Sequence, residues 1–174
     1  NSYAIGKFEL TKGEYAKFVA DTQHSSQGGC YFRTGLEPEL EIALSWRNPG
    51  YDQDHNHPAV CVSWDDATAY VKWVSKVTGE SYRLPSEAQW EKAARGTDER
   101  TYPWGEGIDC DRANYTSYCV GDTSEVGSYE SGKSSYGIYD MAGNVLEWVD
   151  DWYAAYPGNT IVDSDYGTTY RVLR

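Results

Sequence analysis

The chain has 174 residues, which is enough for one domain with a sizeable hydrophobic core but too few for two comfortable domains. Its formal net charge of −12 at pH 7 argues against nucleic acid or an anionic membrane surface as the main partner and favours the binding of cations. No apolar run approaches the length of a membrane span, and the 16 Tyr, 7 Trp and 17 Gly are typical of a loop-rich fold packed around aromatic rings.

The first elements expected along the chain are a short strand and a helix. Tyr3–Phe8 has the composition of a short strand, and Thr11–Glu14 is a capping box of the kind that starts helices. Apolar side chains then recur at helical spacing at Tyr15, Phe18 and Val19. The sequence therefore predicts a helix that begins at the capping box and buries this apolar face.

Two further helices are predicted in the middle of the chain, after a short strand at Ala59–Val62. Ser63–Asp66 opens the first of them, and Gly79 ends it in the position where a left-handed residue is needed. Ser86–Gln89 opens the next helix, which ends near Gly96. The core-facing side of the longer helix is expected to contain the apolar residues Ala67, Tyr70, Val71, Val74 and Val77.

The remainder of the chain is expected to be largely irregular. From about residue 97 to residue 136 it is rich in Gly, Ser, Asn and Asp, which are typical of turns, and a last short strand is expected at Tyr170–Leu173. The predicted fold class is therefore α+β, in one domain with much irregular backbone. Because loops cannot satisfy their own amide groups as helices and sheets do, something else must order them. Disulfide bonds and bound calcium are the usual fasteners.

The four cysteines, Cys30, Cys61, Cys110 and Cys119, fit neither a CxxC redox site nor a zinc ribbon. An even number of cysteines in an acidic chain rich in Tyr and Gly favours two disulfides, and therefore an oxidising location that is extracellular, periplasmic or in the cell envelope. Three pairings are possible, and the sequence alone does not choose between them. We favour a short loop from Cys110 to Cys119 and a longer one from Cys30 to Cys61, with four reduced, mostly buried thiols as the alternative.

The most informative segment is Tyr136–Asp151, with the sequence YGIYDMAGNVLEWVDD. Asp140, Asn144 and Glu147 carry hard oxygen donors at spacings that let a loop fold around a cation. Gly143 permits the tight turn that aims main-chain carbonyls in one direction. The alternative interpretation of this segment is an acidic surface loop beside a buried tryptophan.

Two other groups of polar residues are interpreted as structural. Asp65 and Asp66 resemble a pair of acid–base carboxylates, but they occupy the first turn of a predicted helix, where the helix dipole favours acids. Arg83, Glu87 and Glu91 lie close enough on a turn and the following helix to form an ion-pair network that holds this corner in place.

Four motifs follow one another in a fixed order: His57–Trp64 (HPAVCVSW), Tyr82–Glu91 (YRLPSEAQWE), Tyr102–Gly105 (YPWG) and Gly137–Trp148 (GIYDMAGNVLEW). In order and spacing, over nearly the whole chain, they resemble the formylglycine-generating enzyme (sulfatase-modifying factor) family. The resemblance implies that residues 1–174 form a single domain of this type that lacks its C-terminal segment. It also implies the formylglycine-generating-enzyme variant of the C-type lectin fold, with little regular secondary structure and irregular loops fastened by calcium.

The resemblance places a first calcium site in the loop before the Glu-Trp pair. Its ligands would be the side chain of Asp140, the backbone carbonyls of Gly143 and Val145, and the carboxylate of Glu147. All four are oxygen donors, as calcium requires. At the position of Asp140 the family usually has an uncharged Asn, so this chain departs from the family there by a charged side chain.

A second calcium site in the family begins at an Ala-Asn pair, which corresponds here to Ala113-Asn114. It would use the side chain of Asn114 and the carbonyl of Tyr115. The remaining ligands come from a loop that departs from the family's usual acidic pattern at Tyr118–Asp122, where Asp122 is a substitute donor. The resemblance therefore implies calcium as a structural cofactor.

In the family's catalytic members, a pair of cysteines binds copper(I) and activates oxygen, and a soft ion of this kind requires thiolates. Both cysteines follow a Gly-Gly-Ser segment after the Arg-Val motif, and this sequence ends at Tyr170–Arg174, where that segment would begin. None of the four cysteines stands at a catalytic position, and Leu146 replaces a tryptophan of the substrate groove.

Two functions are therefore expected. The first is a calcium-stabilised, non-catalytic, C-type-lectin-like binding module whose ligand is a protein, a peptide or a glycan and not a nucleic acid. The alternative is a truncated formylglycine-generating oxidoreductase that converts a sulfatase cysteine to formylglycine with copper and oxygen. Copper would be a cofactor only if the absent C-terminal segment carries the cysteine pair. The acidic charge, the expected disulfides and Leu146 favour the binding module.

Overall fold

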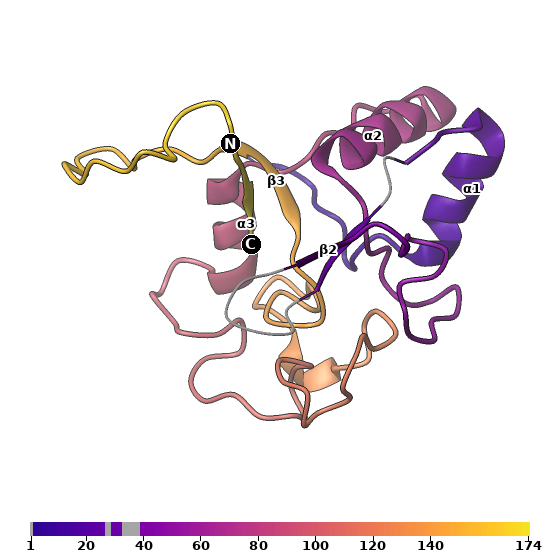
Figure 1. The fold of residues 1–174 in the computed structure, drawn as a ribbon. Coiled ribbons are helices and arrows are strands. Elements are labelled where there is room, and N and C mark those ends of the chain that lie inside the picture. Colours follow the sequence, from indigo (N-terminus) through magenta and orange to yellow (C-terminus); the bar gives the residue numbers. More distant parts are fainter. Residues whose placement is uncertain (1, 27–28, 33–38) are drawn as a thin grey trace.

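The computed structural model describes residues 2–26, 29–32 and 39–174 of the chain. Most of this backbone is irregular, and Figure 1 shows long loops between a few short helices and strands. The regular elements are, in chain order, α1 (Lys12–Thr22), β1 (Cys30–Phe32), β2 (Glu39–Glu41), α2 (Trp64–Thr78), α3 (Glu87–Arg95), a 3-10 turn (Glu130–Gly132), β3 (Trp148–Trp152) and β4 (Arg171–Leu173). Among the described residues, no helix combines the length and the apolar composition needed to cross a membrane.

All three predicted helices are confirmed, and each begins at the capping box that predicts it. At the start of α1, Thr11 Oγ1 accepts a hydrogen bond from the backbone of Glu14, whose carboxylate accepts one from the Thr11 N–H in return. The same reciprocal pair closes the first turns of α2 and α3, and in α2 the second partner is Asp66, which confirms a structural role for this acid. The C-cap of α2 is Gly79, whose left-handed φ of 78° costs glycine little. Local side-chain chemistry therefore sets the helix boundaries.

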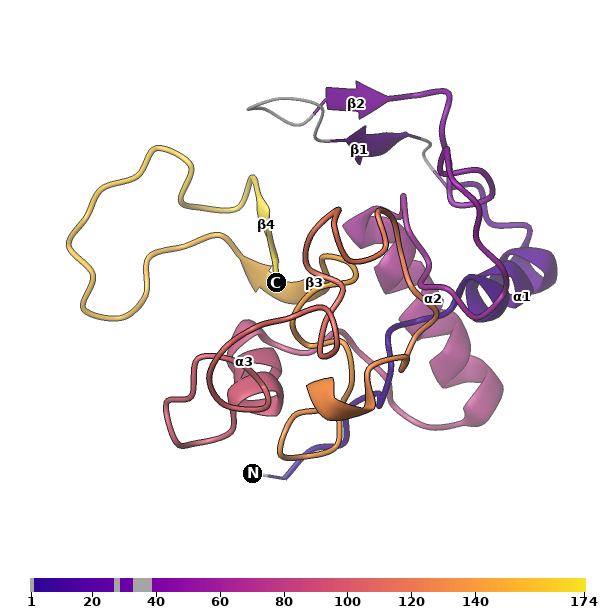
Figure 2. The same cartoon turned by 90° about the horizontal axis from the view of Figure 1, so that it is seen from below.

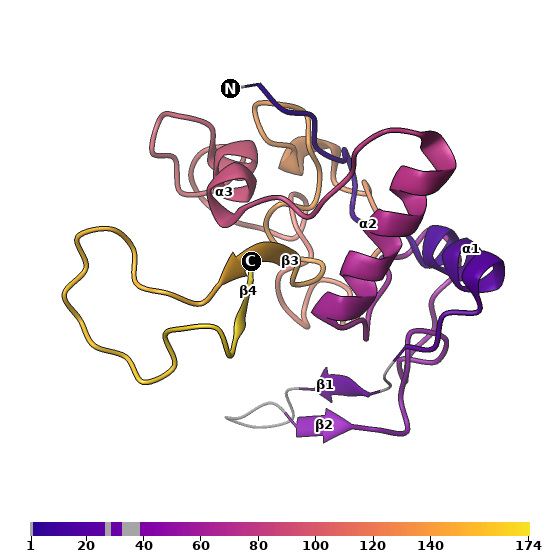
Figure 3. The ribbon, with the colours of Figure 1, turned by 90° about the horizontal axis from the view of Figure 1, so that it is seen from above.

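The first hydrophobic cluster lies between α1 and α2, which are neighbours in Figures 1 and 3. Its buried members are the three predicted α1 residues and one tryptophan: Tyr15, Phe18, Val19 and Trp46. The ring of Tyr15 meets that of Trp46 edge-on, with 5.1 Å between centroids, an arrangement that aromatic pairs prefer. The prediction of an apolar α1 face is therefore confirmed.

The α2 face that joins this cluster is only partly the predicted one. Tyr70 packs there as expected, but its neighbours from α2 are Ala69 and Trp73, and Val77 is 60% exposed. Val71 lines a cavity shared with the loop that leads into β3. The difference arises because α2 is covered by α1 on one side and by this loop on another, so that its apolar side chains divide between two neighbours.

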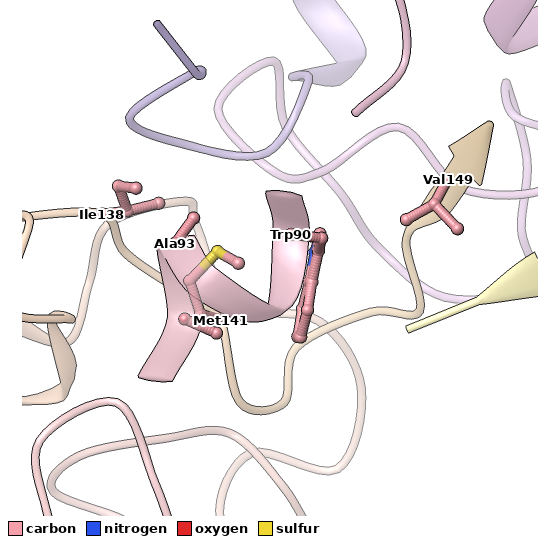
Figure 4. Close-up of a cluster of buried hydrophobic side chains, with 6 residues drawn as sticks. Trp90, Ala93, Ile138, Met141 and Val149 are labelled. Carbon is pink, nitrogen blue, oxygen red and sulfur yellow. The ribbon is translucent and has the colours of Figure 1, made fainter. Parts of the chain in front are cut away.

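The second hydrophobic cluster packs α3 against the loop that leads into β3. Trp90 and Ala93 come from α3, Ile138 and Met141 from the loop, and Val149 from β3 (Figure 4). All five side chains are buried. Because burying a side chain the size of Ile138 or Met141 contributes about 1.5–3 kcal/mol, this cluster holds the loop firmly on α3.

The strands form two small antiparallel sheets. In the first, β1 pairs with β2 and Cys30 lies opposite Glu41; in the second, β3 pairs with β4 and Trp148 lies opposite Leu173. The strand predicted at Tyr170–Leu173 is therefore confirmed as β4. Figures 2 and 3 show that strands β1 and β2 and the long connection between β3 and β4 project from the rest of the molecule.

The predictions of strands at Tyr3–Phe8 and Ala59–Val62 are wrong. Both segments are irregular and make isolated backbone contacts: the Tyr139 N–H donates to the Lys7 carbonyl at 3.0 Å, and the Ala59 N–H donates to the Leu10 carbonyl at 2.7 Å. A sheet needs successive pairs of this kind along both chains, and here they do not repeat. Conversely, β1, β2 and β3 are strands without a predicted counterpart.

Both favoured disulfides are confirmed. Cys30 bonds to Cys61 and Cys110 bonds to Cys119, so all four cysteines are oxidised. The first bond ties β1 to the segment just before α2, and the second closes a loop inside the turn-rich region. Such cross-links restrict the unfolded chain and so stabilise loops that few backbone ladders support. They also indicate an oxidising compartment.

Candidate metal centre

The predicted site residues lie on two loops that touch. Four of them belong to residues 137–147 (the β3 loop), and two belong to residues 110–119, which a disulfide closes (the disulfide loop). The Asn144 N–H donates to the Asn114 carbonyl at 2.7 Å, which joins the loops backbone to backbone. The structure therefore brings the residues of both predicted calcium sites to one place.

A glycine is required at position 143, where the two loops meet. A Cβ atom on Gly143 would lie 2.5 Å from the Asn114 carbonyl oxygen, closer than real contacts allow. Its φ of 110° is strained for any other residue, and Asp140 and Asn144 also have positive φ values, of 56° and 60°. These positive values, in residue types that tolerate them best, curl the β3 loop tightly, as the sequence predicts for Gly143.

Within the part of the chain that the structure describes, the predicted carbonyl ligands have no backbone donors. Among the backbone–backbone hydrogen bonds of the described residues, none ends on the carbonyl oxygen of Gly143, Val145 or Tyr115. A carbonyl group in this condition must find another partner, such as water or a cation. These oxygens are therefore suitable ligands for a hard metal ion.

The two predicted carboxylate ligands are each held by an N–H donor. Trp90 Nε1 donates to Glu147 Oε2 at 2.9 Å, and the Gly127 N–H donates to Asp140 Oδ2 at 2.6 Å. The peptide groups of Glu147 and Arg174 also pair in both directions, at 2.7 and 2.9 Å. A donor on one oxygen orients the other oxygen of the same carboxylate, as metal-ligating carboxylates require.

Burial raises the pKa of both carboxyl groups. The pKa of Glu147 is raised to about 7, first by burial and then by the charge of Asp140, while the hydrogen bond from Trp90 opposes the shift. Burial also raises the pKa of Asp140, against the hydrogen bond from Gly127. Both groups would ionise more readily with a positive charge beside them.

A third carboxylate, that of Glu9, escapes prediction from the sequence. Its Oε2 atom accepts a hydrogen bond from Asn144 Nδ2 at 2.7 Å, and its Oε1 atom is buried without a hydrogen-bond partner. Burial, and then the charges of Asp140 and Glu147, raise the pKa of Glu9 to about 9. No local pattern marks this residue, because it is 135 positions away from Asn144 in the chain.

The oxygen donors of the β3 loop fit a hard cation such as calcium. Within the described ranges, no three His, Cys, Asp or Glu side chains group together as a metal site, so a site here must combine carboxylates with backbone carbonyls. None of Glu9, Asp140 and Glu147 forms an ion pair with a described Lys or Arg. Neighbouring buried acids without a basic partner avoid the cost of buried charge by taking up protons, as their raised pKa values indicate, or by binding another cation.

Two other oxygen-bearing residues are used differently from the expectation. Asn144 has a structural role, because its Oδ1 accepts from the Ser124 N–H at 2.9 Å and its Nδ2 donates to the Ser124 carbonyl at 3.2 Å. Asp122 meets Asn114 through its backbone: Asn114 Nδ2 donates to the Asp122 carbonyl at 2.6 Å. This hydrogen bond orients the Asn114 side chain, whose Oδ1 atom is the only side-chain atom that can bind a hard cation.

A surface cavity of about 660 Å³ is lined by both loops. Its walls include Asn114 and Tyr115 from the disulfide loop and Asp140 and Leu146 from the β3 loop. Leu146 is 71% exposed and Tyr115 is 46% exposed, so an apolar and an aromatic side chain lie next to polar groups. Concave surfaces with this mixture of groups are typical of ligand sites.

The ion-pair network predicted at the start of α3 contains a different arginine. Arg83 donates to the Leu84 carbonyl, whereas Glu87 and Glu91 both pair with Arg174, Glu87 at 3.2 Å. Arg174 follows β4 in the chain, and its side chain also lines the 660 Å³ cavity. The network therefore joins α3 to the end of β4, which sequence proximity could not reveal.

The sequence profile of the sulfatase-modifying factor enzyme 1-like domain matches residues 1–174. The chain belongs to this family. Among its relatives, the serine/threonine-protein kinase pkn1 of Chlamydia caviae is 47% identical over 106 residues, which cover 60% of this chain and 15% of the kinase. The formylglycine-generating enzyme of Mus musculus is 35% identical over 194 residues, which cover 90% of this chain and 50% of the enzyme.

The fold of this sulfatase-modifying factor domain agrees with that assignment. The structure of PvdO from Pseudomonas aeruginosa matches with a TM-score of 0.68 and 34% sequence identity, over 84% of this chain and 56% of that protein. A formylglycine-generating-enzyme-like fold with few helices, short strands and two disulfides is therefore confirmed. The chain spans half the length of the mouse enzyme and a smaller part of the kinase.

Proposed function

We propose that this sulfatase-modifying factor domain is a calcium-stabilised, non-catalytic binding module whose ligand is a protein, a peptide or a glycan. Residues 1–174 would form one domain with the formylglycine-generating-enzyme variant of the C-type lectin fold. The disulfides favour an extracellular, periplasmic or cell-envelope location. The family is one whose members use calcium and copper, and the oxygen donors of this chain suit calcium.

The observation that carries the proposal is that buried carboxylates of the β3 loop lie in the same loop as carbonyls that accept no backbone hydrogen bond from a described residue. Asp140, Gly143, Val145 and Glu147 would supply four oxygens to a first calcium ion, with water completing its coordination. The ion would offset the charge of buried acids and hold the β3 loop in its curled form. Its contribution would therefore be structural.

A second calcium ion would bind through the disulfide loop. Its protein ligands would be the side-chain oxygen of Asn114 and the backbone carbonyl of Tyr115. Because Asn114 contacts Gly143 and Asn144, an ion here would brace the junction between the two loops. Two ions at this junction would hold the loops in place, as backbone hydrogen bonds hold helices and sheets in place elsewhere in the molecule.

The state of the cysteines supports a non-catalytic function. Copper(I) requires thiolates, and all four cysteines of this chain are held in disulfides. Leu146 stands exposed where the catalytic relatives are expected to place a tryptophan. The similarity to a small part of a protein named a serine/threonine kinase supports the use of such domains as modules beside other activities.

The 660 Å³ cavity supports ligand binding on the same face. Its polar walls can form hydrogen bonds, and the exposed Leu146 and Tyr115 can pack against an apolar or sugar surface. The net charge of −12 disfavours nucleic acid. A peptide or glycan array, probed with the purified chain in calcium and in EGTA, would identify the ligand class.

Thermal unfolding in excess calcium and in excess EGTA tests the calcium site. A ligand that binds only the folded state at about 100 times its Kd stabilises the protein by about 2.7 kcal/mol. For a chain of this size that corresponds to a rise in Tm of about 5–11 °C. An identical Tm in calcium and EGTA would refute the calcium-stabilised module.

The alternative function is part of a formylglycine-generating oxidoreductase whose copper-binding cysteines lie outside these 174 residues. The 35% identity to the mouse enzyme over 90% of this chain favours it. The test uses the natural protein that contains these residues, incubated with copper, oxygen and a cysteine-containing sulfatase peptide. Detection of formylglycine by mass spectrometry would establish the oxidase, and an unmodified peptide would favour the binding module.

A further inference from the structure

The N-terminal segment runs along the β3 loop and delivers one carboxylate to it. The Tyr139 N–H donates to the Lys7 carbonyl at 3.0 Å, and the rings of Phe8 and Tyr139 lie 5.0 Å apart. Beyond Glu9, the Leu10 carbonyl accepts the Ala59 N–H at 2.7 Å. Because the chain is fixed on both sides of Glu9, the position of this side chain against the β3 loop is fixed as well.

The Glu9 carboxylate holds the backbone between two predicted carbonyl ligands. Its Oε2 atom accepts from Asn144 Nδ2 at 2.7 Å. Asn144 has a left-handed φ of 60°, and Ser124 holds its side chain from the other direction. Residue 144 is thus clamped in a conformation that sets where the Gly143 and Val145 carbonyls point.

We propose that Glu9 is a positioning residue of the calcium site, which holds the β3 loop in its cation-binding form from a distant part of the chain. This inference rests on the proposed calcium-stabilised function and adds to it a residue outside the predicted ligand set. Glu9 does not itself need to bind the ion. It acts through Asn144, whose side chain it holds.

The choice of a carboxylate at position 9 supports this role over a purely structural one. A neutral side-chain amide could accept the same bond from Asn144, but it would place an NH2 group where Glu9 has its second oxygen. Instead, Glu9 Oε1 is buried without a hydrogen-bond partner, and no described Lys or Arg pairs with this carboxylate. A cation bound in the β3 loop, next to Glu9, would compensate the buried carboxylate oxygen that has no hydrogen-bond partner.

Calcium titration of Glu9 variants tests the inference. Glu9→Gln keeps the shape and one acceptor oxygen but replaces the second oxygen with an NH2 group, and Glu9→Ala removes both oxygens. Isothermal titration calorimetry of chelator-stripped protein should show calcium affinity about tenfold weaker for Glu9→Gln and about 10–100-fold weaker for Glu9→Ala, as for other residues that support metal ligands. Glu80→Gln is the matched control, because it makes the same chemical change at an exposed position.

The outcomes separate this inference from the proposed function. If the wild type binds no calcium, the calcium site itself is wrong and this inference falls with it. If the wild type binds calcium and Glu9→Gln binds it equally well, Glu9 is not a positioning residue, even if Tm in EGTA falls. The supporting result is a calcium-induced rise in Tm that shrinks in Glu9→Gln and is unchanged in Glu80→Gln. The conservative Glu9→Gln variant decides the test if Glu9→Ala does not fold.

Discussion

The substitution Gly143→Ala tests whether contact between the β3 loop and the disulfide loop orders the candidate site. The space that the new methyl group needs is taken by backbone: the Asn114 carbonyl oxygen at 2.5 Å, its carbon at 3.0 Å and Tyr115 Cα at 3.4 Å. Backbone atoms cannot rotate away as the end of a side chain can. One of the two loops must therefore move.

The expected loss of stability has two parts. A residue other than glycine at the φ of 110° costs on the order of 1–3 kcal/mol of backbone strain. Forcing a methyl group into a packed region costs about another 1–3 kcal/mol. We expect Gly143→Ala to lower the free energy of unfolding by about 2–6 kcal/mol and to weaken calcium binding, because the displaced segment carries predicted ligands.

Gly105→Ala is the matched control for backbone strain. Gly105 has a φ of 125°, and a Cβ atom there would meet nothing within 4 Å. The control should lose only about 1–3 kcal/mol, from strain, and should keep its calcium affinity. Urea unfolding followed by tryptophan fluorescence, with calorimetric calcium titration, measures both effects. Equal losses in the two variants would refute the argument that the loops are held together at Gly143.

Three further predictions concern pH, one disulfide and one stacked arginine. In EGTA, the free energy of unfolding should fall as pH rises from about 4.5 to about 9. Folding raises the pKa of Glu147 from 4.5 to about 7 and that of Glu9 from 4.5 to about 9, so the folded state binds more protons than the unfolded state in this range. The stabilisation by the protonated carboxyl groups is therefore lost as they ionise. Urea unfolding across this range checks it, and a rise in stability would contradict it. Replacing both Cys110 and Cys119 by Ser should cost about 2–3 kcal/mol, since the disulfide closes a loop with a sequence separation of 9; an unchanged urea midpoint would show that the loop is ordered without it. The Arg171 guanidinium lies 3.6 Å from the centre of the Trp64 ring and 3.4 Å from that of the Trp152 ring. Arg171→Met should therefore lower the free energy of unfolding by about 1–3 kcal/mol and change the near-ultraviolet circular dichroism. A loss below about 0.5 kcal/mol would argue against these contacts.

Several features of this protein are determined by residues close together in the sequence. The capping boxes that begin at Thr11, Ser63 and Ser86 place all three helices, because each box is complete within four residues. Gly79 ends α2 for an equally local reason, its tolerance of a left-handed backbone. The order of the family motifs likewise predicts the family and the irregular fold, and the even cysteine count favours the two disulfides.

Tertiary structure alone decided the features that depend on contacts between distant segments. The short strands β1, β2 and β3 lack a clear local pattern and exist through their partners, while Tyr3–Phe8, which has a strand-like composition, finds no continuous partner. Glu9 meets Asn144 across 135 residues, and the collision that requires glycine at position 143 involves the distant Asn114. Capping uses neighbours that the chain always keeps together, whereas these contacts exist only after loops from different parts of the chain have packed.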